Sequence, residues 1–269
     1  MTSASISSER RVGCVLDVES VLDPDVFALV SNKTNGGYNR SALQRSVCAS
    51  VLTFTESDPH GDLKVLGLQT FHLGLLSEVE LLAAVDTCLP DPADEGVRLV
   101  TYNGRAHDLV VLRQRAERLW LFNLDRLRGW DFERERHVDL IYHYGQHSQR
   151  RPSLADVAAL LGTSIRTLAC SPNIAASARA RDWDPVVRRN QVDVAATFLA
   201  YGHVRAWQRG CARPAASAWT SLADWARALR ERSSHLGDFS HHQLVDHARA
   251  RLAASVGGRE LCGCRASGG

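Results

Sequence analysis

Apolar and polar positions alternate with the period of a β-strand over the first part of the chain. Residues 12–18 form one apolar run after a polar leader, and residues 47–55 and 63–72 form two more. A short segment of turn-forming residues, 58–62, separates the last two runs, and a connection of this length joins antiparallel neighbours. The pattern therefore predicts three strands, of which the second and third form a hairpin.

From Ser77 the apolar positions change to the helical period. Ser77 and Ser153 have the side chains of helix N-caps, and Pro90 and Pro92 end the first predicted helix. The further predicted strands are residues 97–102 and 137–142, and the further predicted helices are residues 108–119, 153–161 and 184–207. This order is typical of a mixed α/β sheet, since a strand that feeds a helix implies a parallel crossover.

The chain beyond the last of these helices has a different pattern. Residues 210–216 have the composition of a linker, and two more helical patterns follow at 221–232 and 241–254. We therefore predict two units. An α/β domain takes up residues 1–209, and a C-terminal helical extension with a flexible tail takes up residues 210–269.

Composition is that of an ordinary globular protein. Hydrophobic residues make up 45% and charged residues 23%, so neither disorder nor a fibrous repeat is indicated. No apolar run approaches the ~20 residues that a membrane-spanning helix needs, and the polar N-terminus lacks the apolar core of a signal peptide. A cytoplasmic protein with no membrane contact is the expectation. The net charge of +2 is small, but arginine far outnumbers lysine, and guanidinium groups suit bidentate contacts to phosphate.

Two acidic side chains end the first predicted strand. Asp17 and Glu19 are two residues apart, so both leave the same face of the sheet and repel each other. A cation between them relieves that repulsion, and oxygen ligands of this kind select Mg²⁺ or Mn²⁺. The alternative is an ordinary solvated strand end without a metal.

Two more acids are candidate metal ligands, each with an alternative interpretation. Asp108 lies at the start of a predicted helix, where an acid also stabilises the helix dipole without any metal. Asp193 lies among apolar residues of the last long predicted helix, so its carboxylate needs a charged partner. That partner is either a metal ion or an arginine.

The order and setting of these acidic segments resemble the DEDD superfamily of 3′→5′ exonucleases, also called DnaQ-like. The likeness is greatest to the proofreading exonuclease domains of family B DNA polymerases and their stand-alone bacterial relatives. It runs from about residue 12 to residue 207, and His107 stands where the family usually has an aromatic residue. Three motifs carry the resemblance: Val15-Leu16-Asp17-Val18-Glu19, Asn103-Gly104 followed by His107-Asp108-Leu109, and Asp193 followed by Thr197 and Tyr201.

The resemblance implies a ribonuclease H-like fold, which is a mixed five-stranded α/β sheet of order 3-2-1-4-5 with strand 2 antiparallel, flanked by helices. It also implies two divalent cations, Mg²⁺ or Mn²⁺. Asp17 would bridge both ions, Glu19 and Asp193 would complete the site of the attacking water, and Asp108 would support the site of the leaving 3′ oxygen. The implied activity is hydrolysis of single-stranded nucleic acid from its 3′ end to 5′-mononucleotides, with DNA favoured over RNA.

The same resemblance suggests residues that contact the substrate. Asn103 would lie beside the terminal nucleotide, and His107 is a further candidate contact to the substrate. Arg105, Arg188 and Arg189 would contact phosphates, and the alternative for each is an ordinary surface arginine.

One position departs from the family pattern. Such enzymes usually carry a tyrosine four residues, or a histidine five residues, before the last aspartate, where this chain has Arg189 and Arg188. An arginine cannot act as a base. Three alternatives follow: the metal alone activates the water, His107 or His203 substitutes, or the chain is a catalytically silent relative that binds nucleic acid.

A different class of function is an interaction subunit, as a homo-oligomer or in a larger complex, that docks through the C-terminal helices. Trp207, Trp219 and Trp225 would then anchor the interface. The alternative is that these tryptophans form a local helical core.

Overall fold

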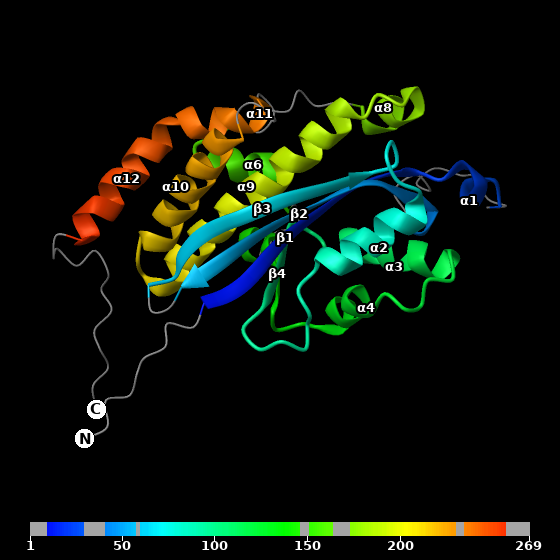
Figure 1. Ribbon diagram of the computed structural model, residues 1–269, viewed down its shortest axis with the longest axis horizontal. Coiled ribbons are helices and arrows are strands. Elements are labelled where there is room, and N and C mark those ends of the chain that lie inside the picture. Colours follow the sequence, from blue (N-terminus) through cyan, green and yellow to red (C-terminus); the bar gives the residue numbers. More distant parts are fainter. Residues whose placement is uncertain are drawn as a thin grey trace, which may run out of the picture.

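A five-stranded sheet of order β3-β2-β1-β4-β5 forms the centre of the molecule (Figure 1). The structure is a computed structural model, and it describes residues 10–29, 41–57, 60–145, 151–163, 173–229 and 234–256. β2 is antiparallel to β1 and β3, whereas β4 is parallel to β1 and β5. The predicted fold class and strand order are confirmed. The strands are β1 Arg10–Leu22, β2 Gln44–Ser57, β3 Asp62–His72, β4 Arg98–Thr101 and β5 His137–Asp139.

Helices cover both faces of the sheet (Figure 1). One face carries α2 Glu78–Cys88, α3 Asp108–Arg118 and α4 Asp125–Phe132. The other face carries α6 Leu154–Leu160, α9 Asp184–Arg209 and α10 Arg213–Ala228, with α12 Gln243–Val256 packed on α10. The other described helices are α1 Pro24–Ala28, α5 Leu140–Tyr144, α8 Ile174–Ala180 and α11 Ser234–Gly237, with the 3-10 helices η2 Ser41–Leu43 and η3 Asp238–His241.

The alternation of side chains along β1 separates two hydrophobic cores. Cys14, Leu16 and Val18 belong to the core under α2, α3 and α4, whereas Val15 belongs to the core under α9 and α10. Successive side chains of a strand point to opposite faces, so Asp17 and Glu19 point with Val15 toward α9. Burial of each such apolar side chain stabilises this register by about 1.5–3 kcal/mol.

Helix caps form where the sequence predicted them. The Ser77 backbone amide donates to Glu80 Oε2 at 2.7 Å, and Glu80 N donates to Ser77 Oγ at 3.3 Å. Ser153 and Asp156 make the same reciprocal pair at the start of α6. These bonds satisfy amides that an α-helix leaves without partners at its N-terminus.

The fifth strand is shorter than the sequence predicts. β5 ends at Asp139, whose side chain accepts a hydrogen bond from Ile141 N at 3.3 Å and so caps α5. The prediction of a strand over residues 137–142 is therefore wrong beyond Asp139. The sequence also did not predict α1, α4, α5 and α8, because segments of five to eight residues contain too few turns to display a helical period.

The stretch predicted as a linker contains the start of α10. This helix begins at Arg213 and has Pro214 in its first turn, where proline is tolerated. Ser217 Oγ accepts a hydrogen bond from Leu63 N at 2.8 Å, and Ser221 Oγ accepts one from Val65 N at 2.7 Å. α10 therefore packs along β3 and shares a core with the sheet, and the division of the chain at residue 209 stays a prediction.

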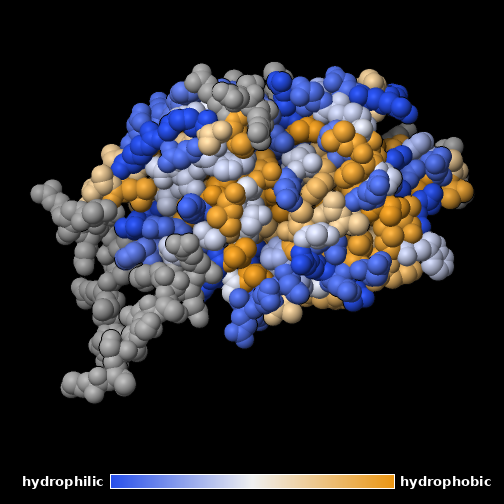
Figure 2. Space-filling view, viewed as in Figure 1, coloured by the Kyte–Doolittle hydropathy of each residue, from blue (hydrophilic) through white to orange (hydrophobic). Residues whose placement is uncertain are grey.

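The tryptophans of the C-terminal half have different environments. Trp219 is 3% exposed and Trp225 packs against the same core, in agreement with a local helical core, whereas Trp207 is 82% exposed. In the view of Figure 2, hydrophobic side chains gather over the centre and right of the molecule between polar ones, as on most globular proteins. Within the described ranges, no helix combines the length and the apolar character needed to span a membrane.

Candidate metal centre

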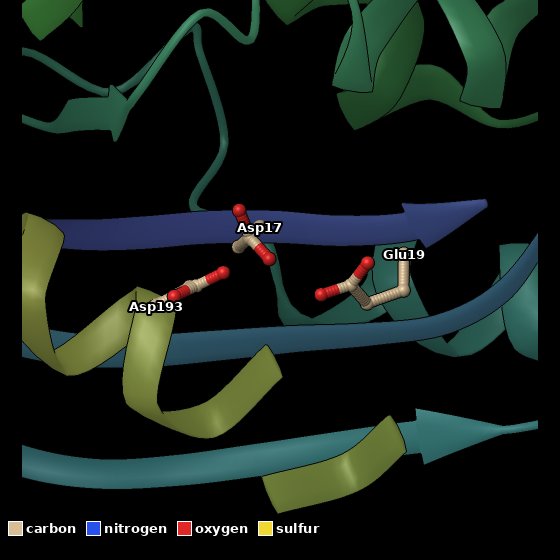
Figure 3. A group of neighbouring side chains, drawn as sticks. All are labelled: Asp17, Glu19 and Asp193. Carbon is tan, nitrogen blue, oxygen red and sulfur yellow. The ribbon is translucent and has the colours of Figure 1, made fainter. Parts of the chain in front are cut away.

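Three of the four predicted acids meet between β1 and α9. Asp17 and Glu19 project from β1, and Asp193 projects from α9 toward them (Figure 3). Each offers a carboxylate oxygen that lies within 4.8 Å of the other two. Asp193 lies more than 170 residues beyond Asp17 and Glu19 in the sequence, and the packing of α9 on the sheet brings it to them.

The fourth acid, Asp108, lies at the first residue of α3 and is 3% exposed. Its carboxylate raises the pKa of Asp17, and the charges of Glu19 and Asp193 raise its own pKa. Asp108 is therefore an electrostatic neighbour of the other three, although its oxygens lie outside the tight group that those three form.

The four carboxylates disfavour one another's ionisation. Burial, followed by the charges of Asp108, Asp193 and Glu19, raises the pKa of Asp17 well above its ordinary value. Burial, followed by Asp193, raises the pKa of Glu19 to about 7. Burial, followed by the charge of Asp139 and then the other acids, raises the pKa of Asp108. Added positive charge is needed before all four are ionised together at neutral pH.

Asn190 positions Asp17, a role that the sequence did not reveal. Asn190 is completely buried on α9, and its Nδ2 donates to Asp17 Oδ2 at 2.6 Å. Cys48 Sγ donates to Asn190 Oδ1 at 3.5 Å, which orients the amide. The signal available in the sequence was a polar amide one helical turn before Asp193, at a position that α9 buries.

Asp139 shapes the turn that leads to Asp108 and was also missed. Asp139 Oδ1 accepts from Asn103 N at 2.7 Å, and Oδ2 accepts from Arg105 N at 2.9 Å. Asn103 has a φ of 68°, in the left-handed region that asparagine tolerates better than most residues. The carboxylate of Asp139 thus holds the Asn-Gly turn from which α3 and Asp108 start.

Arg189 is the partner of Asp193. Its Nε donates to Asp193 Oδ2 at 2.5 Å, across one turn of α9. Burial raises the pKa of Asp193, and the charge and hydrogen bond of Arg189 lower it again without cancelling the rise. Of the two partners that the sequence allowed for Asp193, a metal or an arginine, the structure contains the arginine.

The other predicted site residues lie at varying distances from the acids. Ser20 Oγ lies 3.3 Å from His107 Nε2, and His107 directly precedes Asp108 at the start of α3. Arg105 donates to the backbone oxygens of Arg134 and His137, which directs its side chain toward β5. Arg188 is exposed and pairs with Asp184 at 2.9 Å.

His203 lies away from the acids. It is ten residues beyond Asp193 on the same helix, which corresponds to about 15 Å along the axis. Trp219 Nε1 donates to His203 Nε2 at 3.3 Å. The alternative in which His203 activates the attacking water has no support from this placement.

The donor set fits a hard divalent cation. Its members are carboxylates, and oxygen ligands without nitrogen or sulfur are typical of Mg²⁺ and Mn²⁺ sites. Asp108 Oδ2 and Asp193 Oδ1 are buried, and neither has a hydrogen-bond partner in the part of the chain that the structure describes. Buried acceptor oxygens without donors, inside a group of mutually repelling acids, are what a bound cation would satisfy.

The sequence of residues 78–204 matches the model of the family described as RNase_H superfamily. This segment is therefore similar to members of the RNase H superfamily. The match covers just under half of the chain and includes Asp108 and Asp193, while Asp17 and Glu19 precede it on β1. The ribonuclease H-like fold implied by the three motifs is thereby confirmed, and this fold is one that nucleases with divalent metals use.

Solved structures of exonuclease I are similar at low identity. One, described as suggesting how processivity is achieved, shares 13% identity with a TM-score of 0.39, over 91% of this chain and 45% of its own. The E. coli enzyme in complex with a dT13 oligonucleotide shares 12% identity with a TM-score of 0.40, over 82% of this chain and 44% of its own. The chain thus spans less than half the length of these structures, and a likeness at these scores adds nothing about activity. No curated protein matches the sequence.

Proposed function

We propose that this protein is a 3′→5′ exonuclease that uses two divalent metal ions, Mg²⁺ or Mn²⁺, to hydrolyse single-stranded nucleic acid to 5′-mononucleotides. The observation that carries the proposal is the meeting of Asp17, Glu19 and Asp193 within 4.8 Å, with Asp108 as their electrostatic neighbour. The RNase H-like sheet supports it, because strand β1 and the long helix α9 hold three of the acids rigidly.

The four acids and the residues of the turn before α3 would have separate roles. Asp17, Glu19, Asp108 and Asp193 hold the ions, which when bound lower the pKa of water toward neutrality and offset charge on the leaving oxygen. Asn103, on the turn that precedes Asp108, would lie beside the terminal nucleotide, and His107 would be a further contact to the substrate. Single strands are the proposed substrate, with DNA favoured over RNA, because a terminal base must leave its pair to reach buried acids.

The second candidate is a catalytically silent relative that binds nucleic acid. The ion pair between Arg189 and Asp193 favours it, because a guanidinium can stand in for a metal charge permanently. The proposed cytoplasmic location, and assembly of copies through the C-terminal helices, apply equally to both candidates.

Cleavage of a labelled strand separates the two. A single-stranded DNA labelled at its 3′-terminal nucleotide is incubated with the full chain and Mn²⁺ or Mg²⁺. We expect early release of labelled 5′-mononucleotide, none of it in the presence of EDTA. The same strand as RNA gives the sugar preference.

Two variants make the result specific to the site. Asp17→Asn keeps the shape of the side chain and removes its repulsion with the other acids, so the variant folds. We expect it to release labelled mononucleotide no faster than buffer alone. Asp125→Asn removes an acid that is 76% exposed and leaves release unchanged. Release by Asp17→Asn at the wild-type rate, or no release by the wild type with either metal, contradicts the proposal.

A further inference from the structure

Arg189 is the cation of the acidic cluster. Besides its hydrogen bond to Asp193, its charge lowers the pKa of Glu19 and of Asp17. Burial lowers the pKa of Arg189, but Asp193, followed by Glu19 and Asp17, raises it overall, so the guanidinium stays charged. One arginine therefore supplies positive charge to three of the four carboxylates.

The Arg189 guanidinium and a metal ion at Asp193 would both bind the same carboxylate. The guanidinium occupies Oδ2 of Asp193 at 2.5 Å and leaves Oδ1 buried without a hydrogen-bond partner among the described residues. A divalent ion bound to this carboxylate would face a positive charge at short range in a partly dry site, where repulsion is poorly screened. The ion and the present position of Arg189 are thus mutually unfavourable.

The guanidinium has another acceptor available once substrate is present. The Arg189 side chain is 29% exposed, whereas that of Asp193 is 8% exposed, so the arginine lies on the solvent side of the pair. A phosphate group, like a carboxylate, accepts two parallel hydrogen bonds from a guanidinium. A phosphodiester bound over the acids would therefore give Arg189 a second anion with which it can pair in place of Asp193.

We propose that Arg189 is a displaceable counter-ion, which holds Asp193 in the absence of substrate and passes to a substrate phosphate when nucleic acid binds, so that Asp193 takes up its metal ion only then. The inference rests on the proposed function and adds a regulation to it. Metal uptake at Asp193 and phosphate binding reinforce each other by the same factor. In the protein without nucleic acid, metal ions would therefore bind to the other carboxylates first and to Asp193 last.

Mn²⁺ binding measured directly tests this without reference to cleavage. The electron paramagnetic resonance signal of free Mn²⁺ is followed during titration of the full chain, with and without thymidine 5′-monophosphate. We expect the wild type to have one weaker Mn²⁺ site that the nucleotide tightens about tenfold or more. In Arg189→Gln that site is already tight without nucleotide, and the nucleotide adds less than about threefold.

Arg227→Gln is the matched control. It removes an arginine of α10 that pairs with Asp224 at 3.3 Å, and neither residue belongs to the acidic cluster. Its titrations match the wild type and account for Mn²⁺ held by the nucleotide itself. Arg189→Lys keeps the positive charge, so it leaves the site weak; it also provides a folded variant should Arg189→Gln unfold.

The outcomes are distinct. A weak site that is unchanged or weaker in Arg189→Gln, or that becomes tight in Arg189→Lys, overturns the role of Arg189 while leaving a metal-dependent nuclease intact. Absence of any Mn²⁺ binding by the wild type, with or without nucleotide, removes the metal site and with it both the proposed function and this inference.

Discussion

Asn190 gives a test of how one neutral side chain supports the acids. Replacing it by alanine removes the donor to Asp17 Oδ2 from a fully buried position. We expect Asn190→Ala to lower the free energy of unfolding by about 1–3 kcal/mol, and Asn190→Asp to lower it further at pH 7, because it adds a fifth carboxylate. Urea unfolding in EDTA measures both.

The cleavage rate should fall with the same substitutions, since Asp17 loses its fixed orientation. Asn123→Ala, at an exposed position between α3 and α4, serves as control and should match the wild type. Wild-type stability together with wild-type cleavage in Asn190→Ala would show that Asp17 does not depend on this amide.

The residue scale also shows what the sequence could predict. Asp17, Glu19, Asp108 and Asp193 could be named because acids in apolar or strand-end settings are costly without a partner. Asn190 and Asp139 could not, because their roles are hydrogen bonds to residues 173 and 36 positions away, which only the packed fold defines. Arg189 was noticed as a departure, but its pairing with Asp193 depended on which rotamer the packed helix allows.

At the scale of elements, long periodic segments were predicted well and short ones were not. The hairpin of β2 and β3 and the capped helix α2 follow from alternation and from the Ser77 cap. β5 ended early because Asp139 serves as an N-cap, and this function competes with continuing a strand. The start of α10 was missed because alanine, proline and arginine at 212–216 resemble a linker until proline is recognised as a helix start, whereas its second half lies within the helix predicted over 221–232.

Asp139 connects β5 to the turn before α3, so its removal should loosen that turn locally. In Asp139→Ala the amides of Asn103 and Arg105 lose their acceptor, and we expect their hydrogen exchange to become about tenfold faster or more. In Asp139→Asn one acceptor oxygen remains, so one of the two amides keeps its protection. Exchange followed by nuclear magnetic resonance reads both amides separately, and unchanged protection of both in Asp139→Ala contradicts this role.

At the scale of the whole molecule, Glu56 joins strands and helix through buried charge. The side chain is 1% exposed on β2, and it accepts hydrogen bonds from Arg205 and Tyr201 of α9 at 3.0 Å each, with Arg98 of β4 4.0 Å away. Burial alone would raise the pKa of Glu56, but the hydrogen bond and charge of Arg205, followed by Tyr201 and Arg98, lower it overall. The packing of α9, which carries Asp193, therefore depends on an ionised Glu56.

Glu56→Gln should destabilise the fold by about 3–5 kcal/mol at pH 7, because it leaves buried guanidinium groups without their counter-ion. A carboxylate with a lowered pKa in the folded state stabilises above its unfolded pKa of about 4.3 and loses that effect as the pH falls through its folded pKa. The difference in unfolding free energy between wild type and variant is thus constant from pH 7 to pH 5 and shrinks below that. Urea unfolding across this range measures it, with Glu117→Gln, at a side chain 58% exposed, as the variant that changes little. A difference that instead grew on acidification would mean that Glu56 is protonated in the fold and that other contacts hold α9 against the sheet.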